Sequence, residues 1–123
     1  MKIITDTPNL KAVGPYSLAV EKNGTLYASG QIGIDKDKNP VPGGIEGEFN
    51  QITRNITEIL DNAGYEITDI AKVTILLKDI NDFAKVNELY QEFFKEPYPA
   101  RSTFQVAALP LGVSIEIEII AAK

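Results

Sequence analysis

The sequence predicts an α+β protein in which two helices pack on one mixed sheet of six strands, in the order β-β-β-α-β-α-β-β. Apolar residues recur at steps of three and four over 45–63 and again over 83–93, which is typical of helices that bury one side. The closing run, 113–120, alternates instead between valine or isoleucine on one side and mostly polar residues on the other, as a strand does.

The first three strands are predicted in the N-terminal third. Residues 3–4 form a short strand or arm, and the strand at 17–21 leads into the Asn-Gly pair at 23–24, the strongest short-range signal for a hairpin. The returning strand covers 25–32. Gly30 lies inside it, which indicates a bulge or a point where another group approaches the backbone closely.

The middle of the chain alternates helix and strand. A polar loop at 35–44 leads into the first helix, 45–63, which Gly64 ends. A strand apolar on both faces follows at 72–78, and Asn81 is the predicted N-cap of the second helix. The inner side of that helix carries Phe83, Val86, Leu89, Tyr90 and Phe93.

The last two strands are separated only by a short break at 110–112, which suggests that they form a hairpin. Right-handed crossovers through the two helices place both helices on one face of the sheet. Strand 72–78 is nevertheless apolar on both faces, so the other face needs a cover as well. Because no segment is left to supply it, the sequence predicts an obligate homo-oligomer with sheets packed against one another.

Composition excludes several kinds of chemistry. The 123 residues, expected to form one domain over 1–123, contain no cysteine and no histidine. Thiolate nucleophiles, imidazole bases and metal sites built from either side chain are therefore excluded. Proton transfer must depend on Asp, Glu, Tyr, Lys or bound water.

Charge and hydropathy limit the kinds of partner that the protein is expected to bind. The net charge of −5 argues against binding the phosphate backbone of nucleic acids, which needs a basic surface. No apolar run approaches the roughly 20 residues of a membrane span, and the start lacks the apolar core of a secretory signal. We therefore expect a cytoplasmic protein that binds neither nucleic acid nor membrane.

Arg101 stands out because the chain has only one other arginine, Arg54. At the start of a predicted strand it has two interpretations. It forms a structural salt bridge, to Glu116 or Glu118, or it is a bidentate clamp for a small carboxylate or phosphate. The Pro-Ala pair at 99–100 fixes the backbone just before it, which favours the clamp.

Glu116 and Glu118 share one side of the last strand. If that side faces solvent, both are ordinary outward residues. If a second copy covers it, desolvation raises the pKa of a carboxylate there, while a nearby Arg101 lowers it. Such a balance suits a general acid or base.

Five further residues are candidates for a pocket wall: Tyr16, Ser29, Gly30, Phe83 and Asn87. Phe83 and Asn87 are four residues apart and so share one side of the second helix. Each candidate also has a structural interpretation. Tyr16 is then a packed aromatic, Ser29 a hydroxyl at a strand end, and Asn87 a capping or network residue.

Seven short motifs carry a family resemblance: GPYS at 14–17, ASGQI at 28–32, KDINDF at 78–83, VN at 86–87, YPARS at 98–102, VAALP at 106–110 and IEIE at 115–118. With their spacing, they resemble the RidA/YjgF family of enamine/imine deaminases from about residue 3 to the C-terminus. The resemblance implies a chorismate-mutase-like fold, a homotrimer with sites in the clefts between subunits, and no metal or cofactor. It also implies that the last strand inserts between the third and fourth strands, antiparallel to both.

This family hydrolyses reactive enamines and imines, such as 2-aminoacrylate and 2-aminocrotonate, to 2-keto acids and ammonia. The resemblance implies that Arg101 holds the substrate carboxylate and that Glu116 positions or activates the attacking water. Tyr16, Ser29, Gly30, Phe83, Asn87 and Thr103 would line the pocket.

One position departs from the family pattern. Many members carry cysteine two residues after the arginine, where this chain has Thr103. Threonine keeps the backbone N–H but changes the pocket shape, so substrate preference stays open. Two other functions also remain: a non-catalytic trimer that senses 2-keto acids or similar small carboxylates, and a ribonuclease or translation inhibitor, which the acidic balance and the lack of histidine disfavour.

Overall fold

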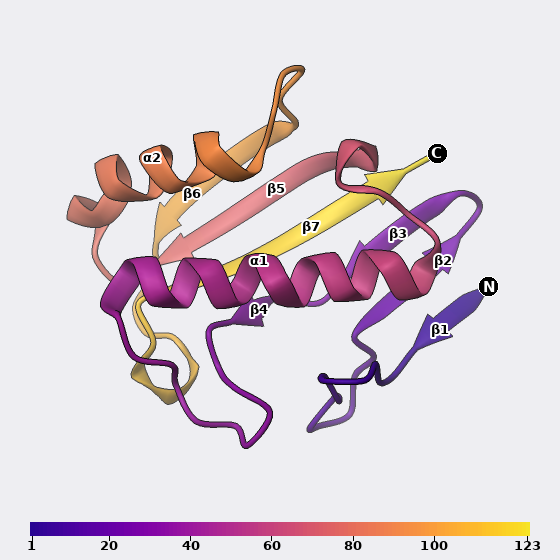
Figure 1. The fold of residues 1–123 in the computed structure, drawn as a ribbon, viewed down its shortest axis with the longest axis horizontal. Helices are drawn as coiled ribbons and strands as arrows, with labels where there is room; N and C mark the ends of the chain where they lie inside the picture. Colours follow the sequence, from indigo (N-terminus) through magenta and orange to yellow (C-terminus); the bar gives the residue numbers. More distant parts are fainter.

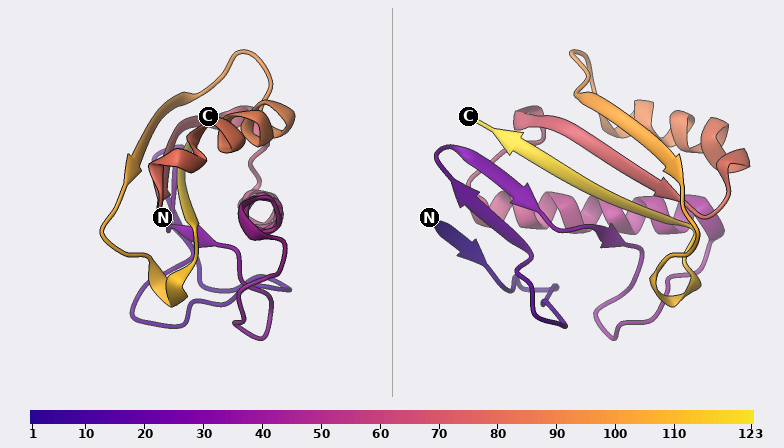
Figure 2. Two further views of the ribbon diagram at one scale, coloured as in Figure 1. Left: turned by 90° about the vertical axis from the view of Figure 1, so that its left-hand side faces the viewer. Right: turned by 180° about the vertical axis from the view of Figure 1, so that it is seen from behind.

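Two helices lie on one face of a single seven-stranded mixed sheet (Figures 1 and 2). The computed structural model describes residues 1–123. The helices are α1 (Gly44–Ala63) and α2 (Phe83–Phe93). The strands are β1 (Lys2–Ile4), β2 (Ala19–Lys22), β3 (Thr25–Ala28), β4 (Gln31–Ile32), β5 (Ile70–Leu77), β6 (Ala100–Gln105) and β7 (Ile115–Ala122). The α+β class is confirmed, as is the end of the first helix at Gly64.

The strand order is β1-β2-β3-β7-β5-β6, with β4 pairing β7 beyond the end of β3. The predicted hairpin between the last two strands is wrong, because β7 lies between β3 and β5, antiparallel to both, and β6 runs parallel to β5. The insertion implied by the family resemblance is confirmed. In this central position both edges of β7 form hydrogen bonds with neighbouring strands. β7 is also the strand of the sheet with the most isoleucines.

The predicted strand at 25–32 is two strands, so the sheet has seven rather than six. Between the pairs Tyr27–Ile120 and Gln31–Ile117 this side of the ladder holds one residue more than β7, which is a β-bulge. Gly30 lies in the bulge. A Cβ there would be 2.3 Å from Oε2 of Glu116, so both the predicted bulge and the predicted close approach are confirmed.

The hydrophobic core fills the space between the helices and the sheet. Side chains of α1, including Phe49, Ile52 and Ile59, pack against the inward side chains of β5 and β7, such as Ile75 and Ile117, and all are essentially inaccessible to water. Each such side chain stabilises the fold by about 1.5–3 kcal/mol. Neither helix has the combination of length and apolar composition that crossing a bilayer requires.

The start of the second helix differs from the prediction. A short 3-10 turn, Ile80–Asp82, precedes α2, and Asp82 rather than Asn81 is the residue that flanks the helix. The carboxylate of Asp79 accepts a hydrogen bond from the N–H of Asn81 at 2.9 Å. Asn81 is not the N-cap because it lies inside the preceding turn, which Asp79 caps.

The opposite face of the sheet carries no helix (Figure 2). The register places large apolar side chains there, among them Ile3, Tyr27 and Phe104, each more than half exposed. This is the uncovered face expected from the apolar residues on both sides of the central strands. Its cover by further copies of the chain stays a prediction.

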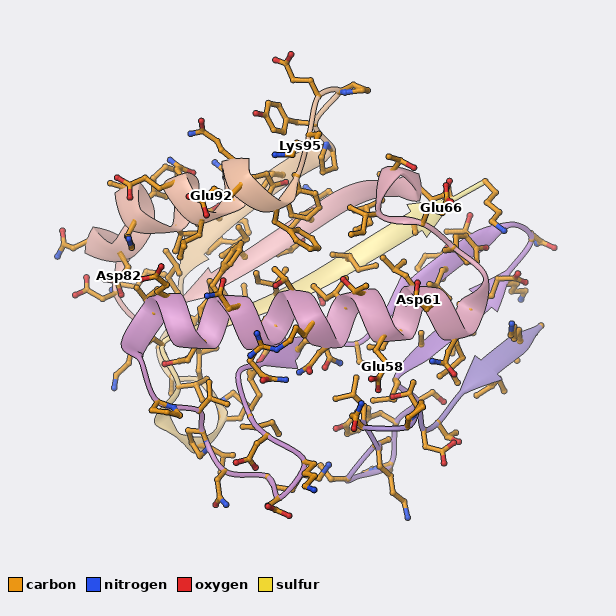
Figure 3. All side chains as sticks on the ribbon, in the orientation of Figure 1. Glu58, Asp61, Glu66, Asp82, Glu92 and Lys95 are labelled. Carbon is orange, nitrogen blue, oxygen red and sulfur yellow. The ribbon has the colours of Figure 1, made fainter.

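Glu58 of α1 ties down the loop that leads into β2 (Figure 3). The hydroxyl of Thr7 donates to one carboxylate oxygen, and Asn9 donates through its backbone N–H at 2.9 Å and its side chain at 2.7 Å. Partial burial raises the pKa of Glu58, but these hydrogen bonds outweigh it, so the pKa lies below its ordinary value.

We expect Glu58→Gln to lower the melting temperature by about 2–4 °C at pH 7, because an ionised acceptor is lost. The pKa of Glu58 is lower in the folded protein than in the unfolded chain, so its ionised form stabilises the fold at pH values above the unfolded pKa. This stabilisation is lost as the pH falls through the folded pKa. The difference in melting temperature between the variant and the wild type should therefore disappear below about pH 4. Thermal unfolding at pH 7 and pH 3 measures it, with the exposed Glu46→Gln of the same helix as control; an equal difference at both pH values would contradict it.

Candidate active site

Arg101, near the start of β6, projects toward the helices because its register partner in β5 is the inward-facing Val73. Its guanidinium carbon lies 4.7 Å from the centre of the Tyr90 ring and 5.5 Å from that of Phe83, both on α2. Both distances are within the range of cation–π attraction. A hollow of about 390 Å³ opens beside it, which we call the arginine hollow; its lining residues are Asn87, Tyr90, Gln91, Tyr98, Pro99 and Arg101.

No carboxylate of the chain pairs with Arg101. The single ion pair of the structure joins Lys85 and Glu88 on α2, 3.7 Å apart. The predicted alternative of a salt bridge to Glu116 or Glu118 is therefore wrong within one chain, because both carboxylates project from the other face of the sheet. Held between aromatic rings and without a counter-ion, the guanidinium keeps its donors available for an anion.

Glu116 is half-buried on the uncovered face of the sheet, opposite Ile32 of β4 and Leu76 of β5. Burial raises the pKa of its carboxyl group above the ordinary value, and the neighbouring carboxylate of Glu118 raises it further. A lowering of this pKa by Arg101 does not occur within one chain. The raised pKa makes ionised Glu116 a stronger base than a free glutamate.

A cavity of about 500 Å³ surrounds Glu116, which we call the glutamate cavity. Tyr16 and Gly30 line it together with Glu116, and its apolar wall includes Leu18 and Leu111. Ser29 lies beside it, where its hydroxyl donates to the carbonyl of Ser17 at 2.6 Å and so ties the Tyr16 loop to the end of β3.

The predicted site residues thus fall into two groups on opposite faces of the sheet. Arg101, Phe83 and Asn87 belong to the arginine hollow or its edge, and Thr103 follows Arg101 on the same side of β6. The Thr103 hydroxyl is buried with no hydrogen-bond partner. Tyr16, Ser29, Gly30 and Glu116 gather at the glutamate cavity. One chain therefore separates the predicted anion-binding group from the predicted acid/base group.

Tyr90 lines the arginine hollow, although its spacing in the sequence predicts only a core position. Its ring stacks on the Arg101 guanidinium, and its buried hydroxyl has no hydrogen-bond partner. Burial raises the pKa of this hydroxyl, opposed by Arg101 and reinforced by Tyr98. The signal was its spacing: Tyr90 follows Asn87 by three residues, so the two share one side of the helix.

We expect Gly30→Ala to abolish most of the deaminase activity that the family resemblance implies, while the fold persists. The added methyl group would lie 2.3 Å from Oε2 and 2.9 Å from Cδ of Glu116, so the carboxylate must move. A displacement of about 1 Å at a reacting group costs about 100-fold in rate. Steady-state kinetics measure the loss, and circular dichroism checks the fold. Activity of wild-type size in Gly30→Ala would show that Glu116 need not stand against the backbone.

Comparisons with known sequences cover nearly the whole chain. A family model described as Endoribonuclease L-PSP matches residues 7–123. The 2-iminobutanoate/2-iminopropanoate deaminase of Mus musculus is 46% identical over an aligned length of 123 residues, and the alignment covers 99% of this chain and 91% of the mouse protein.

Solved structures agree over the same span. RidA from an Antarctic Psychrobacter superposes with a TM-score of 0.93 at 39% identity, over 100% of both chains. TdcF of E. coli, whose structure holds bound serine, gives a TM-score of 0.91 at 37% identity, over 100% of this chain and 99% of that one. The segments that form the arginine hollow and the glutamate cavity lie within the region of similarity.

Proposed function

Because the chain belongs to the Ribonuc_L-PSP (RidA/YjgF) family, we propose that it hydrolyses small 2-imino acids and their enamine tautomers to 2-keto acids and ammonia. The observation that carries the proposal is the Arg101 guanidinium, stacked on Tyr90 and without a counter-ion, in the wall of a hollow of small-molecule size. The name of the mouse relative supports the reaction, and the serine bound to TdcF supports a ligand of amino-acid size.

The proposed site is assembled from two neighbouring copies of the chain. Arg101 and Glu116 occupy opposite faces of one sheet, so a substrate that touches both needs them from different protomers. The uncovered apolar face supplies the packing surface for such an assembly. A homotrimer, in which each arginine hollow meets the glutamate cavity of the next copy, satisfies both requirements.

In the proposed mechanism the two forked N–H groups of Arg101 hold the substrate carboxylate, and the walls formed by Phe83, Asn87 and Thr103 orient the imine. Glu116 takes a proton from water as the oxygen adds to the imine carbon, and returns it to the nitrogen. In the resulting carbinolamine Glu116 moves a second proton from oxygen to nitrogen, which releases ammonia and leaves the keto group. The raised pKa of Glu116 suits a group that must both accept and return protons.

A coupled assay tests the proposal. Serine or threonine dehydratase generates the unstable enamine, and formation of the keto acid is followed with and without the purified protein. We expect the protein to accelerate keto-acid formation in proportion to its concentration. A rate equal to that in buffer alone, at protein concentrations well above those of the dehydratase, would overturn the proposal.

A second candidate is a sensor that binds small carboxylates without turnover, which the serine bound to TdcF favours. The same Arg101 would serve, but Glu116 would be dispensable.

The description of the family model raises RNA cleavage as a third candidate. The net charge of −5 and the acidic side chains on the helix-covered face, including Glu58, Asp61 and Glu92, oppose the approach of a phosphate backbone (Figure 3).

A further inference from the structure

Apart from tyrosine, three residues with polar or charged side chains are buried in the chain: Gln31, Glu48 and Asn55. Gln31 belongs to β4, and Glu48 and Asn55 project from the side of α1 that faces β4 and the start of β7. Burying a polar group costs stability unless it finds a partner. Their gathering beneath β4 and the start of β7, next to the Gly30–Glu116 contact, therefore calls for a role other than packing.

Glu48 fixes the start of β7. Its Oε1 accepts a hydrogen bond from the backbone N–H of Ser114 at 2.8 Å. Ser114 directly precedes β7 and stands two residues before Glu116. A hydrogen bond of this length limits how far the strand can shift along or away from α1.

The same part of α1 fixes β4. Gly33, which directly follows β4, is buried, and a Cβ there would lie 2.7 Å from the Cα of Glu48 and 2.9 Å from its Cβ. The backbone of this strand therefore rests on the helix at Glu48. Two turns further along, the side-chain nitrogen of Asn55 reaches the carbonyl of Ile32 at 3.4 Å, and Ile32 is the residue opposite Glu116 in the ladder.

We propose that Glu48 is a positioning residue for Glu116: it holds the start of β7 by hydrogen bond and the end of β4 by contact, and so keeps Gly30 against the Glu116 carboxylate. The contact it maintains is close, since the Cα of Gly30 leaves no room for even one methyl group beside Oε2. The catalytic consequence of this role rests on the function proposed above; the structural consequence does not.

Loss of the contacts that Glu48 makes with β4 and β7 should change the pKa of Glu116. When β4 and β7 separate, water reaches the carboxylate, and the desolvation that raises its pKa is relieved. The charged groups nearby are Glu118 on its own strand, whose charge raises the pKa of Glu116, and Lys11, Asp35 and Lys38, which line the glutamate cavity. None of these is altered in the variants below, and Glu48→Gln removes the same carboxylate as Glu48→Leu, so a difference in titration between those two variants reports the position of Glu116.

The experiment compares Glu48→Leu, Glu48→Gln and Gly33→Ala with Glu46→Leu, which removes an exposed carboxylate two residues away on the same helix. Titration of the Glu116 carboxyl carbon by NMR gives its pKa, and steady-state kinetics give kcat and KM. In Glu48→Leu we expect Glu116 to titrate at lower pH and kcat to fall about 10- to 100-fold, with KM within about threefold because Arg101 still binds the carboxylate. Glu48→Gln keeps an acceptor for Ser114 and should recover most of the loss, and Glu46→Leu should match wild type.

Gly33→Ala reaches the same result without removing a charge, because its methyl group pushes β4 off the helix. If Glu48→Leu does not fold, Gly33→Ala tests the positioning of Glu116 in its place. A folded Glu48→Leu or Gly33→Ala variant with the Glu116 titration and kcat of wild type would overturn the proposal. If the wild-type protein shows no deaminase activity, the proposed function fails, while the NMR titration still decides whether Glu48 positions Glu116.

Discussion

Replacing Arg101 by methionine is expected to lower kcat/KM for 2-iminobutanoate by about 10²- to 10³-fold. Methionine keeps an unbranched apolar stem but removes the guanidinium, and with it the stacking on Tyr90 and every donor to the substrate carboxylate. Truncating one partner of a buried, hydrogen-bonded charge pair costs about 2–5 kcal/mol, and about 3–4 kcal/mol corresponds to this loss. Because the carboxylate is bound before and during reaction, KM should rise as well as kcat fall.

The chain offers a matched control in Arg54, its only other arginine. Arg54 is exposed on α1, where it donates to the side chain of Gln51 at 2.9 Å, and Arg54→Met removes the same charge from a residue that lines neither cavity. Its kcat/KM should stay within about threefold of wild type. Equal losses in both variants would mean that net charge matters and that Arg101 holds no carboxylate; the coupled dehydratase assay measures both.

Glu116→Gln is expected to lower kcat by about 10²- to 10³-fold, which is within the usual contribution of a general acid or base. Glutamine is nearly isosteric and still fits against Gly30, but it can neither accept nor return a proton at neutral pH. Binding of the unreactive product 2-ketobutyrate, measured by calorimetry, should change less than about threefold. Loss of turnover with retained binding separates an enzyme from a sensor, for which Glu116→Gln would leave the biological response intact.

Glu118→Gln is the control for that variant, because it removes a carboxylate from the same face, two residues along β7. Glu118 is exposed, and its charge raises the pKa of Glu116. Without it, Glu116 ionises more easily, so the acid limb of the pH–kcat profile should move to lower pH while the maximal kcat stays within about threefold. An unchanged limb in Glu118→Gln would show that a group other than Glu116 controls the profile.

Part of the fold follows from local sequence alone. The Asn-Gly turn adopts the positive φ values that its residues favour, 53° at Asn23 and 77° at Gly24. The helix boundaries and the alternation of β7 likewise depend on residues near one another in the chain. The predicted helix start at Asn81 was wrong for a local reason as well, since Asn81 lies inside a 3-10 turn that the Asp79 carboxylate caps.

The position of β7 could not be derived from local sequence. Its short connection to β6 favours a hairpin, but insertion between β3 and β5 satisfies both of its edges and buries Ile115, Ile117 and Ile119 under α1. That gain depends on strands distant in sequence. Only the resemblance carried by motifs along the whole chain anticipated it.

The sequence by itself determined which kinds of group are available: without cysteine or histidine, proton transfer must depend on Asp, Glu, Tyr, Lys or water, and the family resemblance selected Arg101 and Glu116 as candidates among them. Only the tertiary structure decided where they lie: Arg101 beneath α2, Glu116 against Gly30 on the other face, and Glu48 bridging to Ser114. The physical reason is that successive side chains of a strand point to opposite faces, so the face a residue occupies is set by the pairing register, which long-range packing selects.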